Sequence, residues 1–177
     1  MSASITQLDN FRDTDFSGGY GRVNIPSMRI IEGTRSFDID TVLSKPLFAH
    51  LATSSQLGAR DSPVWFLWED ATLWIIGHKE TDTFPKRILA DSRVAVGIVD
   101  FNAATGLVRH VGIRGTAQVA PFNRERVKRL FTKYLGANEE DWDQRLTGDV
   151  IRGDGYLLVK VTPDTAVVRD QSYRVRR

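Results

Sequence analysis

The stretch from residue 48 to residue 119 constrains the fold most, because it packs several short β-type runs around a single basic helical segment. Runs rich in β-branched and aromatic residues that stop at turn residues are typical of strands. Many short strands with few helices favour an antiparallel barrel over a parallel, doubly wound sheet. We therefore predict a mainly β fold, with strands over 47–53, 62–70, 71–78, 93–101 and 108–120.

Three helices are predicted beside these strands, over 37–46, 81–89 and 122–136, and Asp38 or Asp40 could cap the first. In the last helix Asn123 is the expected N-cap and Gly136 the expected C-terminal cap. Its apolar stripe has helical spacing and faces the core: Val127, Leu130, Phe131, Tyr134 and Leu135. Its basic group is expected to be a solvated face: Arg124, Arg126, Lys128 and Arg129.

The two ends of the chain differ from its middle. Residues 1–35 are polar and irregular, with a glycine cluster, which favours an N-terminal arm, and residues 36–177 are expected to form one domain. A final strand is predicted over 155–163, and residues 166–177 either pair as one more strand or run free.

Composition excludes several classes of function. The chain carries 24 basic and 22 acidic residues, a balance that gives no electrostatic footprint for nucleic acid. It has no cysteine, which excludes disulfides, thiolate metal sites and cysteine nucleophiles. No apolar run approaches the roughly 20 residues of a membrane span, and no signal peptide is evident. We expect a cytoplasmic protein with no membrane or nucleic-acid partner.

The common catalytic and metal-binding patterns are missing from the sequence. The three histidines, His50, His78 and His110, stand in different predicted strands without the spacing of metal ligands, and no G-x-S-x-G elbow occurs. We predict no metal site, and the catalytic residues stay unassigned. Two strands are apolar on both faces, so one face needs a helix or a second subunit to cover it. A homodimer is the simplest solution.

The segment 81–89, TDTFPKRIL, is the best candidate for a binding site. Thr83 can cap a helix that carries Pro85 in its first turn, and Lys86 and Arg87 add positive charge beside the free amide groups. Hydroxyl, amides and cations together would cradle a phosphate. The alternative is an ordinary capped basic helix.

The strand 62–68, SPVWFLW, can offer backbone groups and a flat aromatic surface to a ring. A planar, phosphorylated cofactor over this strand would use both features, because His78 ends the neighbouring strand just before the cradle. The alternative places Trp65, Trp68 and Trp74 in the core.

These segments, in this order, resemble the pyridoxamine 5'-phosphate oxidase-like, FMN-binding split-barrel superfamily. The matching runs are FAHLAT, GARDSPVWF, KRILADSRV and RHVGIRGTAQV. The resemblance implies a six-stranded antiparallel split β-barrel that is a homodimer with two FMN sites at the interface.

The resemblance also implies the cofactor-binding residues. The strand at Ser62, Pro63, Val64 and Trp65 would contact the flavin ring and ribityl chain, and the segment from His78 through Thr83 to Arg87 would hold the phosphate. The match to the superfamily's basic run is ambiguous by one position, so Lys86 and Arg87 are both assigned to the phosphate, with Lys86 preferred. His110 replaces a glutamine that reaches the flavin in the true oxidases, and would act from the partner chain.

Two departures argue against vitamin B6 oxidation. Ser62 stands where true oxidases often have arginine, and 130–149 replaces their substrate-binding region. We expect an FMN-dependent oxidoreductase, a flavoprotein with an unassigned small-molecule substrate. The alternatives are a non-catalytic flavin-storage or flavin-sensing protein, a split barrel that uses a deazaflavin coenzyme, for which the basic tail with Arg174 is suited, or one that uses haem, with His50 or His78 as axial ligand.

Overall fold

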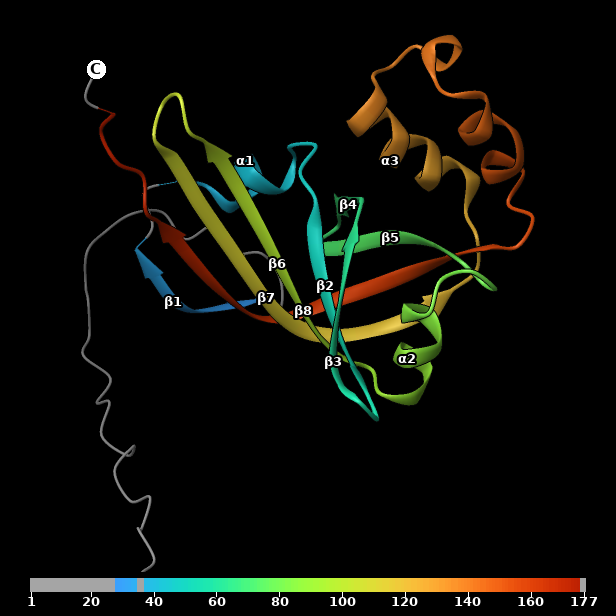
Figure 1. Ribbon diagram of the computed structural model, residues 1–177, viewed down its shortest axis with the longest axis horizontal. Coiled ribbons are helices and arrows are strands. Elements are labelled where there is room, and N and C mark those ends of the chain that lie inside the picture. The colour runs from blue at the N-terminus through green and yellow to red at the C-terminus, as the bar shows by residue number, and fades with distance from the viewer. Residues whose placement is uncertain (1–27, 35–36, 176–177) are drawn as a thin grey trace, which may run out of the picture.

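The computed structural model describes residues 28–34 and 37–175, and it is built around one strongly curved sheet of eight strands (Figure 1). Seven strands follow the order β3-β2-β6-β7-β8-β5-β4, and β1 pairs with β8. The strands are β1 (Arg29–Thr34), β2 (Ala49–Ser55), β3 (Gly58–Val64), β4 (Phe66–Glu69), β5 (Thr72–His78), β6 (Arg93–Asn102), β7 (Leu107–Ala120) and β8 (Tyr156–Asp170).

The barrel is split between β3 and β4. These strands lie at opposite ends of the sheet order, yet only Trp65 separates them in the chain. The single strand predicted over 62–70 is therefore wrong: the chain changes neighbours at Trp65, pairing with β2 before it and with β5 after it. A pattern of apolar residues does not reveal this change, because the apolar run 64–68 passes through Trp65 without a turn residue.

The long strand β8 spans both halves of the sheet. Its first half pairs with β5 up to Val161, and its second half pairs with β1 from Thr165 onward. Between them the register with β7 shifts beside Gly115, whose missing side chain leaves room for the Thr162 carbonyl oxygen. Proline fits such an irregularity because it donates no ladder hydrogen bond, and Pro163 stands there. Of the two alternatives for the end of the chain, pairing is confirmed as far as Asp170.

The mainly β split barrel is confirmed, with eight strands in the described residues where six were expected. Besides the division at Trp65, the extra strand is β1, which comes from the expected arm and runs parallel to β8. Residues 1–27 of that arm lie outside the described residues. The division into an arm and one domain stays a prediction.

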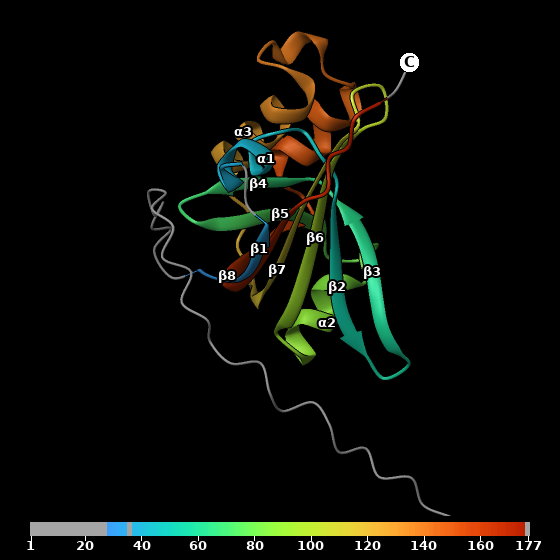
Figure 2. The same ribbon diagram turned by 90° about the vertical axis from the view of Figure 1, so that its left-hand side faces the viewer.

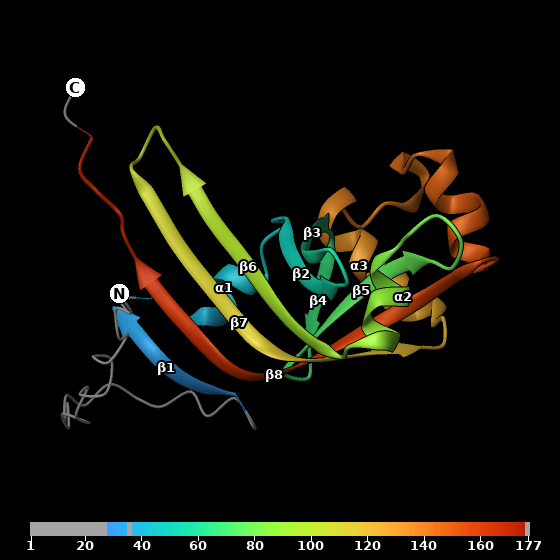
Figure 3. The same cartoon turned by 60° about the horizontal axis from the view of Figure 1, so that its bottom comes forward.

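The helices lie at the ends and edges of the sheet (Figures 2 and 3). Asp38 caps α1 and Asn123 caps α3, each through its side-chain oxygen, as the sequence predicted. None of the described helices is long and apolar enough to cross a membrane. The helical elements are α1 (Ile39–Leu43), α2 (Phe84–Ala90), α3 (Arg124–Leu135), the 3-10 turn η1 (Glu139–Asp141) and the kinked π-helix η2 (Leu146–Val150).

Two apolar cores support this arrangement. The larger one fills the barrel with fully buried side chains such as Phe66, Ile75 and Ile98. The smaller one lies under α3, where Val127, Leu130 and Phe131 bury the predicted stripe. Burying one large aliphatic or aromatic side chain contributes roughly 1.5–3 kcal/mol.

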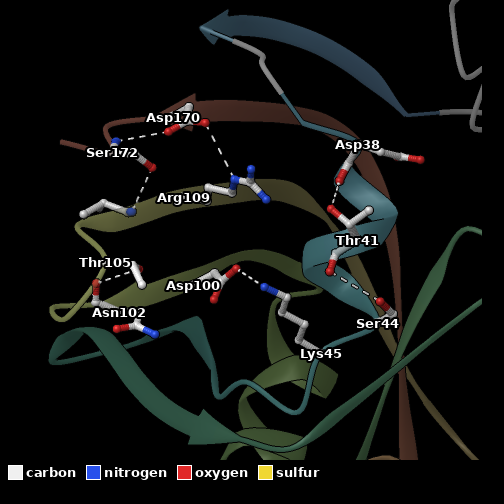
Figure 4. Close-up of polar contacts among 11 residues, drawn as sticks. Asp38, Thr41, Ser44, Lys45, Asp100, Asn102, Thr105, Arg109, Asp170 and Ser172 are labelled. Carbon is white, nitrogen blue, oxygen red and sulfur yellow. Dashed lines mark hydrogen bonds and ion pairs between the residues drawn. The ribbon is translucent and has the colours of Figure 1, made fainter. Parts of the chain in front are cut away.

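Ion pairs hold α1 and its flanking residues against β6, β7 and β8 (Figure 4). Lys45, just after α1, lies 2.5 Å from the buried carboxylate of Asp100 on β6. On the neighbouring strands Arg109 lies 3.6 Å from Asp170 and over the ring of Phe37. These contacts cross α1, β6, β7 and β8, so they fix the position of a helix of only five residues.

The expected solvated face of α3 is confirmed for Arg124 and Arg129, which are exposed, whereas Arg126 is half-buried. Arg126 and Arg129 both donate to the carboxylate of Glu69 at the end of β4. The Arg126 guanidinium also lies 3.7 Å from the centre of the Trp74 ring. These cations therefore fasten α3 to the β4–β5 hairpin, a contact between segments almost sixty positions apart that local sequence cannot signal.

We expect Glu69→Gln to lower the free energy of unfolding by about 1–3 kcal/mol, because it weakens charged hydrogen bonds to two arginines at a half-buried carboxylate. Urea denaturation measures the loss. The matched control is Glu139→Gln, which affects an exposed pair with Lys128 and should change stability by less than about 1 kcal/mol. Equal losses in the two variants would contradict the tethering role of Glu69.

Candidate functional site

A pocket of about 510 Å³ lies where the barrel is split. One wall is β3 with Trp65, another is the loop that leads into α2, and the third is formed by α3, η2 and the start of β8. Its lining residues are Asp61, Ser62, Pro63, Val64, Trp65, Ile76, Thr81, Asp82, Thr83, Phe84, Phe131, Leu146, Val150 and Tyr156.

The strand β3 brings four of the predicted site residues to this pocket: Ser62, Pro63, Val64 and Trp65. Because β3 is the last strand of the sheet order, one of its two edges has no neighbouring strand in the sheet. An edge strand presents a row of unpaired backbone donors and acceptors. The polar edge of a planar ligand can bind such a row.

Arg87 of α2 lies beside this pocket and contacts two of its lining residues, Ser62 and Thr83. Its guanidinium donates to three hydroxyl groups: Thr53 Oγ1 at 2.7 Å, Thr83 Oγ1 at 2.6 Å and Ser62 Oγ at 3.3 Å. In the part of the chain that the structure describes, no carboxylate pairs with this cation. Each hydroxyl accepts from Arg87, so its own hydrogen is left to donate elsewhere. Uncompensated positive charge ringed by hydroxyl donors is suited to an anion.

Thr83 and Lys86 differ from the sequence prediction in their local roles. Thr83 precedes α2, but its hydroxyl makes no capping bond, because it accepts from Arg87 instead. Lys86 is exposed, and within the described residues no hydrogen bond or ion pair holds it. Between the two registers that the sequence left open, the geometry places Arg87 and not Lys86 with Ser62 and Thr83.

His78 lies beside the pocket and not in its lining. Its Nδ1 accepts from the backbone N–H groups of Glu80 and Thr81, and its own backbone N–H donates to Asp82. Its ring packs edge-on against Tyr156. His78 therefore orders the loop that carries Thr83. Because Nδ1 accepts two hydrogen bonds, the neutral ring carries its proton on Nε2, which leaves neither ring nitrogen free to bind a haem iron.

Sequence reasoning missed two groups near the pocket. Thr53 is 3% exposed and bonds Arg87, and a lone threonine among the inward-facing positions of β2 was its only signal. Asp61 lines the pocket and lies 2.8 Å from His50 Nδ1 in an exposed pair. Nothing in the spacing along the chain indicates that pair, since it forms across two strands.

His110 lies in a different hollow, of about 330 Å³, on the outer face of the sheet. We use this name for the side of β6 and β7 away from the barrel core. Gly97 and Gly112 are paired across these strands and leave the hollow without side chains at its centre, while Arg114 and Arg169 flank it. Burial and the charge of Arg169 lower the pKa of His110. Within one chain His110 is not brought to the pocket beside β3.

Trp65 is held in place by α3. Its ring stacks on Tyr134 with ring centres 4.5 Å apart and the planes within 6°. The Tyr134 hydroxyl accepts from the Phe66 N–H at 3.1 Å and donates to the Leu47 carbonyl oxygen at 2.6 Å. Lys133 donates to the carbonyl oxygens of Leu43 and Phe66, both at 2.9 Å. The junction between β3 and β4 at Trp65 is therefore held from both sides, which suits a wall of a binding site.

No group of three or more histidine or acidic side chains that could hold a metal ion gathers among the described residues.

Comparison with known proteins identifies the fold alone. Scans against protein families and against curated proteins find no match. Solved structures do match. An F420 reductase is 20% identical with a TM-score of 0.56, over 75% of this chain and 98% of that chain. A pyridoxamine 5'-phosphate oxidase-like protein from Listeria innocua is 17% identical with a TM-score of 0.55, over 73% and 94%. A FAD-binding protein from Mesorhizobium loti is 14% identical with a TM-score of 0.59, over 78% and 96%.

Lys133, which helps to hold the β3–β4 junction at Trp65, makes the stability of the protein depend on pH. Burial lowers the pKa of Lys133 from 10.5 to about 7. The unfolded chain thus binds a proton between these values that the folded protein does not, so the free energy of unfolding rises with pH across this window. We expect Lys133→Met to flatten that rise. Urea denaturation of both proteins between about pH 7 and pH 10 tests this, and parallel pH profiles would contradict it.

Proposed function

We propose that this chain, which has the split-barrel fold of the pyridoxamine 5'-phosphate oxidase-like proteins, binds FMN in the pocket beside β3 and acts as an oxidoreductase on a small molecule. The observation that carries the proposal is the Arg87 guanidinium, which has three hydroxyl partners and no carboxylate among the described residues. The donors fit a phosphate, and the volume of the pocket is in the usual range for small-molecule sites.

Each wall then has one task. Arg87, Ser62 and Thr83 would hold the phosphate, since a charged fork with neighbouring hydroxyl donors matches its oxygens. The free edge of β3 from Pro63 to Trp65 would orient the ring through backbone groups. Phe131 and the residues of η2 would exclude water. When bound, FMN supplies the hydride or electron chemistry, and the protein supplies position and electrostatics.

A deazaflavin coenzyme is the second candidate, favoured by the likeness to an F420 reductase. The Arg87 site would serve its phosphate equally well. A flavin-storage or flavin-sensing protein would use the same residues without turnover. Haem is less well supported at His78, because its Nδ1 accepts from two N–H groups and the proton of the neutral ring then lies on Nε2.

We further propose a homodimer through the outer face of the sheet. Val99 and Phe101 on β6 are 49% and 59% exposed beside the hollow of Gly97 and Gly112. An exposed apolar face around a hollow is typical of an interface, and a second copy would cover it. His110 lies on this face, so the dimer would also bring it close to the partner chain.

We expect Arg87→Ala to weaken FMN binding by about 10-fold to 100-fold, because it removes charge-assisted hydrogen bonds to the phosphate. Quenching of FMN fluorescence on titration with protein measures the affinity. Lys86→Ala is the matched control on the same helix and should change the affinity less than about threefold, since the side chain of Lys86 is exposed. If Lys86→Ala is the more damaging variant, the phosphate assignment is wrong.

We expect Val99→Lys to convert a dimer into a monomer, because each interface would bury two unpaired ammonium groups. Analytical ultracentrifugation at a concentration where the unaltered chain dimerises reports the change. Leu57→Lys places the same charge at the tip of the β2–β3 hairpin, where the side chain is 95% exposed, and should leave the dimer intact. A Val99→Lys protein that remains dimeric would place the interface elsewhere.

A further inference from the structure

The segment between α3 and β8, residues 136–155, lies beside α3 at one end of the sheet (Figure 1). We call it the cap, because two of its residues, Leu146 and Val150, line the pocket. Its charged side chains face solvent and pair with one another: Asp143 with Arg145, and Asp149 with Arg152. Its apolar side chains Leu146 and Val150, from the two ends of η2, both line the pocket. The cap is thus amphipathic, with its apolar side toward the pocket.

Aromatic rings continue this apolar wall. Phe131 of α3 and Tyr156 of β8 line the pocket together with Trp65. Phe131 meets the Trp65 ring edge-on at 6.2 Å between ring centres. Offset-stacked and edge-on contacts are the arrangements that aromatic pairs favour, so this wall can contact a further aromatic ring.

The charges that line the pocket are unsuited to an anionic substrate. Asp61 and Asp82 are the charged members of the lining, and no lysine or arginine of the described residues belongs to it. The nearby cation, Arg87, would pair with the flavin phosphate in the proposed site, so its charge would not be available to a substrate. A substrate carboxylate or phosphate would leave water without a positive partner at this wall.

We propose that the cap wall binds uncharged aromatic compounds, and that these are the substrate class of the pocket. The inference rests on the proposed function, because the flavin would occupy the strand side of the same pocket. The apolar side chains of the cap select against charge, and the three rings select for a flat, unsaturated molecule.

The test compares 2-naphthol with 2-naphthoate, which share a ring system and differ in charge at pH 7. Isothermal titration calorimetry on the full chain saturated with FMN measures both affinities. We expect 2-naphthol to bind at least about tenfold more tightly. Leu146→Lys should weaken 2-naphthol binding by about tenfold or more, since it places a charge in the wall. Gln144→Lys adds the same charge at an exposed position of the cap and should have little effect.

Equal binding of the two probes, or tighter binding of 2-naphthoate, would overturn the inference. So would a loss with Gln144→Lys as large as that with Leu146→Lys. Thermal unfolding checks that Leu146→Lys folds, and Leu146→Gln gives an uncharged second variant that should weaken 2-naphthol binding as well. FMN fluorescence separates the two proposals: flavin binding without a probe preference overturns this inference alone, whereas a probe preference in a chain that ignores FMN overturns the proposed function.

Discussion

The candidate site depends on the three hydrogen bonds of the Arg87 guanidinium. They join β2, β3 and the loop before α2, because Thr53, Ser62 and Thr83 come from these three elements. A half-buried guanidinium with only neutral partners keeps its full positive charge. The same bonds that assemble the corner of the pocket therefore also give it the chemistry of an anion site. Two further residues hold the pocket walls in place: His78 orders the loop before α2, and Tyr134 fixes Trp65.

The fold could be predicted from the sequence where the signals are local. Strands with turn residues between them, the Asp38 and Asn123 caps and the apolar stripe of α3 depend on neighbours within a few positions, and the structure confirms them. The division at Trp65 could not be predicted, because the apolar run 64–68 passes through it without a turn residue and the change of neighbour is set by long-range strand pairing. The ion pairs of Glu69 with α3 could not be predicted for a related reason: they join segments that are far apart in the sequence.

The site shows the same limit. The strand from Ser62 to Trp65 and the basic helix were both placed at the pocket from sequence, since each carries its own signal. The choice between Lys86 and Arg87 needed the structure, because adjacent residues of a helix point in directions about 100° apart and only the packing of α2 decides which one faces the sheet. The cap has no strong sequence signal, as its apolar residues are few and its helices are short. The proposed substrate choice would lie in the cap, because its Leu146 and Val150 form an apolar wall of the pocket.

The central claim is that the Arg87 corner binds the phosphate of a flavin. Comparing FMN with riboflavin tests it most directly, because the two ligands differ only in that phosphate. Equilibrium titration of the unaltered chain with each ligand, followed by flavin fluorescence, gives the two dissociation constants. Our account predicts that FMN binds at least about tenfold more tightly, as the loss of charge-assisted hydrogen bonds requires. Equal affinities, or binding of neither ligand, would contradict it.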